Sequence, residues 1–293
     1  MTICEVTRTR CYVIAELGQS HNGSMATARA LIDAASAAGA DAVKSQKRDV
    51  AVPPASWDRE YSGSNSFGRT YAEHRRALEL TVEQHADLSK YARSRGMEYS
   101  CSAWDKVSLD AIDSLDPPWH KVASALGTDQ SMLTWVAEKR RPTLLSTGGT
   151  DQAAVSDAIE ILKMRRRTAI VPWLGVLETT MTYPNENADV GLDVLRAWLW
   201  SSTPLPFADV CGLSGHHRGI QMDVAAVALG ARVIERHLTL DRTMKGTDHA
   251  ASLEPGGFAK LVRDIRAVES ALRGDGIKRV RDCEQAAIAK LRG

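Results

Sequence analysis

Short apolar runs alternate with amphipathic stretches along almost the whole chain of 293 residues. Each apolar run has the length of one buried strand, and each amphipathic stretch has the period of a helix that covers a sheet. Eight strands are predicted, at residues 11–17, 42–46, 98–102, 121–124, 142–146, 170–178, 209–214 and 232–237. The helices that follow them are predicted at residues 24–38, 81–95, 107–115, 131–139, 151–164, 191–200, 219–229 and 255–272.

This alternation implies right-handed crossovers and a parallel sheet. Eight units in a chain of this length favour an α/β fold of the single (β/α)8 TIM-barrel type, which typically takes about 250 residues. An open doubly wound sheet is the alternative. However, no GxGxxG motif follows the first strand, and the chain has no P-loop. We therefore predict one barrel domain over residues 1–273.

Two segments fall outside the repeat. Residues 49–77 are long for a βα loop and rich in Pro, Ser, Gly and charge, and we expect them to form a lid at the catalytic face. Residues 274–293 form a basic, polar tail with a weak helical pattern near its end.

Charge and cysteine usage exclude several functional classes. Lys and Arg number 37 against 36 Asp and Glu, so the chain lacks the excess of base that nucleic-acid binding needs. No apolar run approaches the roughly 18 residues that would span a bilayer. The five cysteines are scattered and show no CxxC spacing, which is typical of a reduced, cytoplasmic protein.

The predicted strands end in polar residues, and a TIM barrel places its chemistry at these carboxyl ends. Lys44 and Lys121 would both point into one mouth, which favours an anionic ligand. Ser146, Thr147 and Gly148 would add neutral donors for phosphate oxygens. For each lysine, the alternative is a side chain that reaches solvent or pairs with a Glu.

Two histidines, His216 and His237, end the seventh and eighth strands. Neutral imidazoles there, with Glu16 or Asp248 nearby, would form a nitrogen and oxygen site for a divalent ion. The alternative is that one or both are rim histidines held by hydrogen bonds. The tryptophans are expected to pack in the interior and not to contact a ligand.

The polar runs also resemble a known family, the N-acetylneuraminate (sialic acid) synthases. The resemblance extends from about residue 12 to 285 and rests on IAELGQSHNG (14–23), GADAVKSQ (39–46), KVAS (121–124), LSTG (145–148), GLSGH (212–216), VIERH (233–237) and GTDHAASLEP (246–255). The last of these motifs is the most specific.

The resemblance implies a TIM barrel that condenses phosphoenolpyruvate with the open-chain aldehyde of a sugar, giving a 2-keto acid and phosphate. It implies a divalent ion, Mn²⁺ or Mg²⁺, with His216 and His237 as metal ligands. Glu16, Glu235 and Asp248 match acidic residues near the reacting carbons or the acceptor. The remaining residues implied to bind substrate are Lys44, Gln46, Ser102, Lys121, Ser124, Ser146, Gly148, Tyr183 and Ser214.

Several positions depart from the family pattern in the part of the site that the resemblance assigns to the acceptor sugar. Gly215 replaces an Asp, Glu178 and Thr179 replace a His-Cys pair, and Met181 replaces an Asn. The family usually continues into a small antifreeze-like domain that completes the acceptor site in a swapped dimer, whereas residues 274–293 resemble only the linker to it. We therefore expect an aldehyde acceptor other than N-acetylmannosamine, and the resemblance also implies a homodimer.

Two other functions remain open from the sequence. One is a metal-dependent aldolase or lyase that uses pyruvate on the same barrel. The other is a non-catalytic relative that acts as a binding partner, although retention of His216, His237 and both lysines argues against it. No feature of the sequence supports a role with nucleic acid or membranes.

Overall fold

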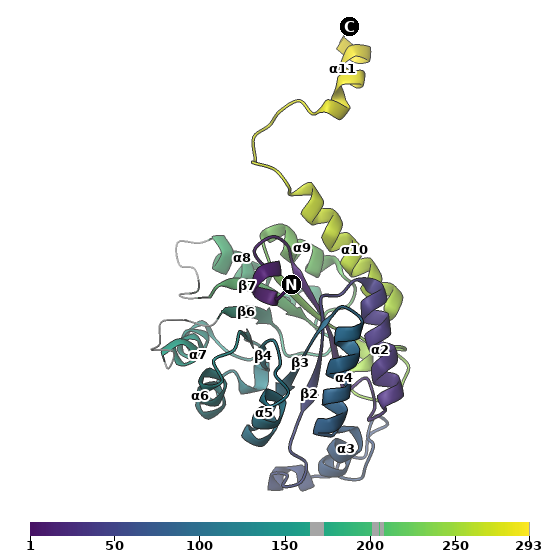
Figure 1. Ribbon diagram of the computed structural model, residues 1–293, viewed down its shortest axis with the longest axis vertical. Helices are drawn as coiled ribbons and strands as arrows, with labels where there is room; N and C mark the ends of the chain where they lie inside the picture. Colours follow the sequence, from purple (N-terminus) through teal and green to yellow (C-terminus); the bar gives the residue numbers. More distant parts are fainter. Residues whose placement is uncertain (165–172, 201–204, 206–207, 293) are drawn as a thin grey trace.

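The computed structural model contains a closed barrel of eight parallel strands in sequence order, β1 to β8 (Figure 1). It describes residues 1–164, 173–200, 205 and 208–292. The strands are β1 Tyr12–Gly18, β2 Ala42–Lys47, β3 Glu98–Ala103, β4 His120–Val122, β5 Thr143–Ser146, β6 Leu174–Thr179, β7 Val210–Gly215 and β8 Val233–His237. The predicted (β/α)8 barrel is confirmed, and residues 170–172 of the sixth predicted strand lie outside the described residues.

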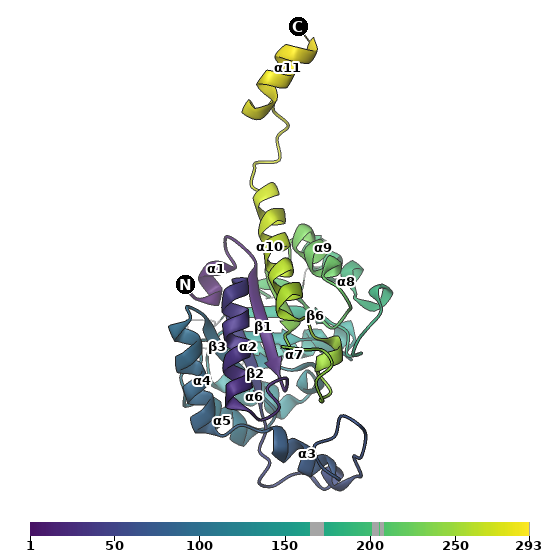
Figure 2. The same ribbon diagram turned by 90° about the vertical axis from the view of Figure 1, so that its right-hand side faces the viewer.

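The helices of the repeat form an outer layer around the strands (Figures 1 and 2). They are α2 Met25–Ala38, α4 Val82–Ser94, α5 Lys106–Asp113, α6 Gln130–Glu138, α7 Gln152–Met164, α8 Leu192–Trp200, α9 Gln221–Leu229 and α10 Pro255–Ala271. Ser24 and Thr81 cap α2 and α4, each with its side-chain oxygen accepting a backbone N–H of the first turn.

The interior of the barrel is apolar at the amino ends of the strands. A short helix, α1 Ile3–Val6, closes this end, and Ile3 and Val6 pack against Tyr12, Trp119 and other inward residues. The helix α1 was not predicted from the sequence; it begins with a capping box formed by Thr2 and Glu5. Apolar side chains fill most of this end, where Glu98 accepts a hydrogen bond from Trp119 Nε1 at 3.0 Å. Most of the other polar inward residues lie at the opposite mouth.

Residues 49–77 were predicted to be one long loop, but they contain regular structure. They contain the 3-10 turn η1 Ala55–Asp58 and most of the helix α3 Tyr71–Leu78. Thr70 and Glu73 form a capping box that starts α3, and Asn65 contacts the loop after β8 at Gly246. The segment therefore has ordered structure beside the mouth of the barrel.

The tail leaves the barrel after α10 and carries one further helix, α11 Gln285–Arg292. Both views show α11 and α3 at opposite ends of the molecule (Figures 1 and 2).

A buried charged cluster joins β7, α9 and β8 on the outer side of the strands. Arg236 donates to Asp223 and to the carbonyls of His217 (2.6 Å) and Gly219 (2.9 Å), and His217 Nε2 lies 3.1 Å from Asp223 Oδ2. Arg236, His217 and Asp223 are at most 1% exposed. The cluster thereby fixes the turn that carries His216. A Cβ on Gly215 would lie 2.8 Å from the His217 ring, so this position needs glycine.

Asp223→Asn should lower the free energy of unfolding by roughly 3–5 kcal/mol, because it leaves Arg236 buried without its counter-charge. Urea unfolding followed by circular dichroism measures this. Asp157→Asn, at an exposed position of α7, is the control and should change stability by less than about 0.5 kcal/mol. Equal stability of the two variants would show that the cluster does not hold the turn.

Candidate active site

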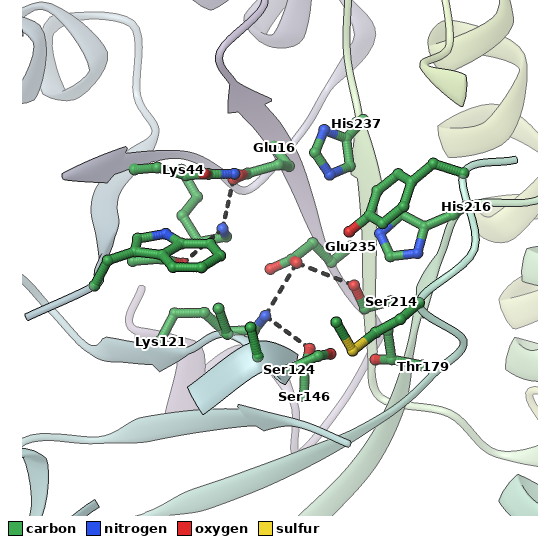
Figure 3. A pocket seen from close by; sticks show the side chains of 17 residues that line it. Glu16, Lys44, Lys121, Ser124, Ser146, Thr179, Ser214, His216, Glu235 and His237 are labelled. Carbon is green, nitrogen blue, oxygen red and sulfur yellow. Dashed lines mark hydrogen bonds and ion pairs between the residues drawn. The ribbon is translucent and has the colours of Figure 1, made fainter. Parts of the chain in front are cut away.

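Alternating residues of the strands converge on one cavity at the carboxyl ends (Figure 3). The cavity brings together most of the residues singled out from the sequence: Glu16, Lys44, Gln46, Ser102, Lys121, Ser124, Ser146, Tyr183, Ser214, His216, Glu235 and His237. Strand register explains the grouping, because Glu16 pairs with Lys44 and with His237, and Ser214 pairs with Glu235.

The two lysines lie on one side of the cavity and are almost fully buried. Lys44 Nζ is 2.6 Å from Glu16 Oε2 and donates to Ser102 Oγ at 2.9 Å. Lys121 Nζ is 3.1 Å from Glu235 Oε1 and donates to Ser146 Oγ at 2.8 Å. Each lysine thus pairs with a Glu, which was one of the alternatives open from the sequence. Each still faces the cavity together with a serine hydroxyl.

Glu235 occupies the centre of this polar network. It accepts hydrogen bonds from Lys121 and from Ser214 Oγ (3.1 Å). Burial alone would raise the pKa of Glu235, but Lys121 and Lys44 outweigh burial and lower it. Glu235 is therefore an ionised carboxylate that orients Lys121.

Gly148 lies beside the lysine side of the cavity, and its backbone N–H donates to Ser124 Oγ at 3.1 Å. A Cβ at this position would lie 2.6 Å from Met181 Cγ and 2.8 Å from Ser124 Oγ. Glycine is therefore required for the close approach of these three residues.

The two histidines lie on the other side, with ring centroids 5.5 Å apart (Figure 3). His216 Nδ1 lies 2.8 Å from the carbonyl oxygen of Thr180, so Nδ1 carries the proton and Nε2 keeps a free lone pair. Burial, and then the neighbouring His237, lower the pKa of His216 to about 3 and keep the imidazole neutral.

These imidazoles fit a divalent ion as two of its ligands. His237 Nδ1 is buried, makes no hydrogen bond and lies 3.8 Å from Asp248 Oδ2. Among the described residues, however, no group of three His, Cys, Asp or Glu side chains has a ready-made metal arrangement. Water or substrate would have to supply the remaining ligands.

Tyr183 and Asp248 complete the histidine side of the site. The Tyr183 ring lies over His216, with centroids 3.9 Å apart, and is 51% exposed, so it forms part of the entrance. Asp248 accepts from the backbone N–H of Gln19 at 3.0 Å and borders an adjoining chamber, outside the cavity that holds the lysines.

Trp104 lines the site but was not singled out from the sequence, whereas Thr179 and Met181, named there as departures on the acceptor side, also border the cavity. The expectation that the tryptophans pack in the interior was wrong for Trp104 and for Trp200, which is 72% exposed. The period of two along a strand could have identified Trp104 and Arg48. Trp104 lies two residues after Ser102 and Arg48 lies two residues after Gln46, so each continues the inward face of its strand.

A separate cavity of about 620 Å³ lies on the outer side of β6, between α7 and α8. Glu178 lines it and accepts a long hydrogen bond from Thr147 Oγ1, at 3.4 Å. Burial raises the pKa of Glu178 from its ordinary value of 4.5 to about 7.

This shift predicts a stability that depends on pH. Because the folded pKa exceeds the unfolded one, the folded state binds the proton more tightly, and stability falls as pH rises from 4.5 to 7. Glu178→Gln should therefore be more stable than the wild type at pH 8, by up to about 3 kcal/mol, with no difference near pH 4. Thermal unfolding of both proteins at the two pH values measures this, and a difference that does not vary with pH would contradict it.

None of the helices in the described part of the chain combines the length and apolar composition needed to cross a bilayer.

Comparison with known proteins identifies the family of this chain. The NeuB family model matches residues 31–278. N-acetylneuraminate-9-phosphate synthase from Homo sapiens is 38% identical over 96% of this chain and 76% of its own length. N,N'-diacetyllegionaminic acid synthase from Legionella pneumophila is 36% identical over 96% of this chain and 78% of its own.

The fold has a close counterpart among solved structures. Sialic acid synthetase from Leptospira borgpetersenii superposes with a TM-score of 0.79 at 24% identity, over 97% of this chain and 92% of that one. The sequence matches establish the relationship, and this chain is an enzyme of the NeuB family.

Proposed function

We propose that this cavity condenses phosphoenolpyruvate with the open-chain aldehyde of a sugar to give a 2-keto acid and phosphate. The bond between C3 of phosphoenolpyruvate and the aldehyde carbon forms, water adds at C2, and the C2–O bond to phosphate breaks. One observation carries the proposal: two buried lysines with serine hydroxyls face two imidazoles across a single cavity.

The lysine side would hold phosphoenolpyruvate. Lys44 and Lys121 would bind its anionic groups, with Ser124, Ser146 and Ser102 as neutral donors. Because Glu16 and Glu235 already neutralise the two lysines, substrate binding would loosen these ion pairs and leave the lysines on the phosphate as it departs.

The histidine side would hold the aldehyde. His216 and His237 would bind a divalent ion, Mn²⁺ or Mg²⁺, which when present polarises a carbonyl oxygen. Glu16 lies between the lysines and His237, so its carboxylate can stabilise positive character at C2 before water adds. Tyr183, whose ring lies against that of His216 at a tilt of 36°, would cover the aldehyde end.

The test is an assay of the purified protein with phosphoenolpyruvate, Mn²⁺ and a panel of N-acylated hexosamines. The proposal predicts one 2-keto acid, detected by mass spectrometry, for each phosphate released. Pyruvate in place of phosphoenolpyruvate should give no product. Product from pyruvate without phosphate would establish the aldolase alternative, and absence of both product and Mn²⁺ binding would support a non-catalytic relative.

A further inference from the structure

A chamber of about 260 Å³ adjoins the active-site cavity on its histidine side. The two spaces share Gln46, Trp104, Tyr183 and His237 as walls. A ligand whose aldehyde lies beside the histidines can therefore extend its remote end into the chamber.

The chamber contains a buried arginine that lacks a counter-charge. Arg48 is 3% exposed, and its guanidinium stacks on Trp104 at 3.8 Å from the ring centroid. Its Nη2 donates to Gln46 Oε1 at 2.9 Å, while Nη1 is buried and has no hydrogen-bond partner. Burial and the neighbouring Arg75 lower the pKa of Arg48 to about 10, so it stays charged at neutral pH.

A second arginine comes from the segment between β2 and α4. Arg75 lies on α3, is half-buried and borders the same chamber, where its Nε donates to the Tyr71 hydroxyl at 2.7 Å. Within the described ranges, no carboxylate lies at ion-pair distance from the guanidinium of Arg48 or Arg75.

The acidic groups nearby do not cancel both charges. Asp248 also lines the chamber, and it is engaged by the Gln19 backbone, by Thr247 Oγ1 and by His237. Glu79, beside the Arg48 backbone, is paired with Lys47 at 2.8 Å. Two arginines against one aspartate leave the chamber with a net positive charge.

We infer that the acceptor carries a phosphate monoester at the end remote from its aldehyde, and that Arg48 and Arg75 bind this group. A buried guanidinium without a counter-charge is costly, and planar guanidinium forks match phosphate oxygens. The assignment rests on the proposed function and defines its acceptor class. The two relatives described above differ in this respect: the name of the human synthase includes a phosphorylated sugar acid, and the name of the Legionella synthase does not.

The experiment compares three acceptors in the phosphoenolpyruvate assay: an N-acetylhexosamine, its 6-phosphate and the matching uronic acid. Formation of the 2-keto acid is followed by mass spectrometry. We expect kcat/KM for the phosphorylated sugar to exceed that for the other two by at least about 100-fold. Equal kcat/KM values for the neutral and phosphorylated sugars would overturn the inference while leaving the proposed function intact. A higher kcat/KM for the uronic acid than for the phosphorylated sugar would also overturn it, because the group bound by the arginines would then be a carboxylate.

Arg75→Met tests the site itself, because Arg75 is half-exposed and its replacement should leave the fold intact. The ratio of kcat/KM between phosphorylated and neutral sugar should fall at least tenfold. Arg76→Met, at the next and exposed position of α3, is the matched control and should keep the wild-type ratio.

Calorimetry of the sugar phosphate without phosphoenolpyruvate gives a readout that does not need turnover. Binding that weakens in Arg75→Met but not in Arg76→Met supports the phosphate site even if the condensation is not observed. Binding that is equal in both variants and the wild type overturns it.

Discussion

Replacing His216 with alanine is expected to lower kcat by at least about 10³-fold and to weaken Mn²⁺ binding by at least about tenfold. The ring has a free Nε2, because Nδ1 is engaged by the Thr180 carbonyl, and its low pKa keeps that nitrogen unprotonated at neutral pH. His237→Ala should have an effect of the same order, since His237 is the second imidazole of the pair. Steady-state kinetics and titration with Mn²⁺ followed by electron paramagnetic resonance measure the two effects.

His120→Gln is the control for these variants. His120 is also buried, but it begins β4 at the apolar end of the barrel, where its Nε2 lies 3.0 Å from Asp113 Oδ1. We expect it to retain kcat and Mn²⁺ affinity within about threefold. Unchanged Mn²⁺ affinity in both His216→Ala and His237→Ala would show that these residues are rim histidines and not metal ligands.

The second large effect is expected at Lys121. Lys121→Met should lower kcat/KM for phosphoenolpyruvate by at least about 10³-fold, because it removes a desolvated charge that would bind the substrate and stabilise the departing phosphate. Ser146→Ala removes one hydroxyl partner of Lys121 and should lower kcat/KM by about tenfold. Kinetics at varied phosphoenolpyruvate and saturating acceptor give both values.

Stability must be measured alongside, since Lys121→Met leaves Glu235 without its nearest cation. Ser146→Ala keeps that ion pair and separates loss of substrate binding from loss of folding. Lys139→Met is the surface control, because Lys139 pairs with Asp110 on the outside of the barrel and should not affect kinetics. A kcat/KM for phosphoenolpyruvate that changes less than threefold in folded Lys121→Met would contradict the assigned role.

Much of the fold and of the cavity could be predicted because strands have a period of two and TIM barrels have one functional mouth. Lys44 and Gln46 share a strand face, and so do Ser214 and His216, so polar residues at strand ends predict a common cavity. Confirmation of the barrel shows that local patterns determine this architecture.

The features that were not predicted are of two kinds: short helices marked only by a few residues at their start, and contacts between segments far apart in the sequence. Both overlooked helices, α1 and α3, begin with a Thr-x-x-Glu capping box, at Thr2 and Thr70, inside segments whose composition is that of a loop. The pairing of Lys121 with Glu235 joins residues 114 positions apart. The placement of Arg75 beside Arg48 depends on how α3 packs over the mouth, which periodicity does not encode.

The central claim is condensation with cleavage of the C–O bond of phosphoenolpyruvate, and the bridging oxygen tests it most directly. The substrate is labelled with ¹⁸O between C2 and phosphorus, and both products of the reaction with the sugar acceptor are analysed by mass spectrometry. Our account predicts that the label leaves with phosphate and that the keto oxygen of the product comes from water. Label retained in the keto acid would mean P–O cleavage or a pyruvate-like intermediate, and would contradict the mechanism.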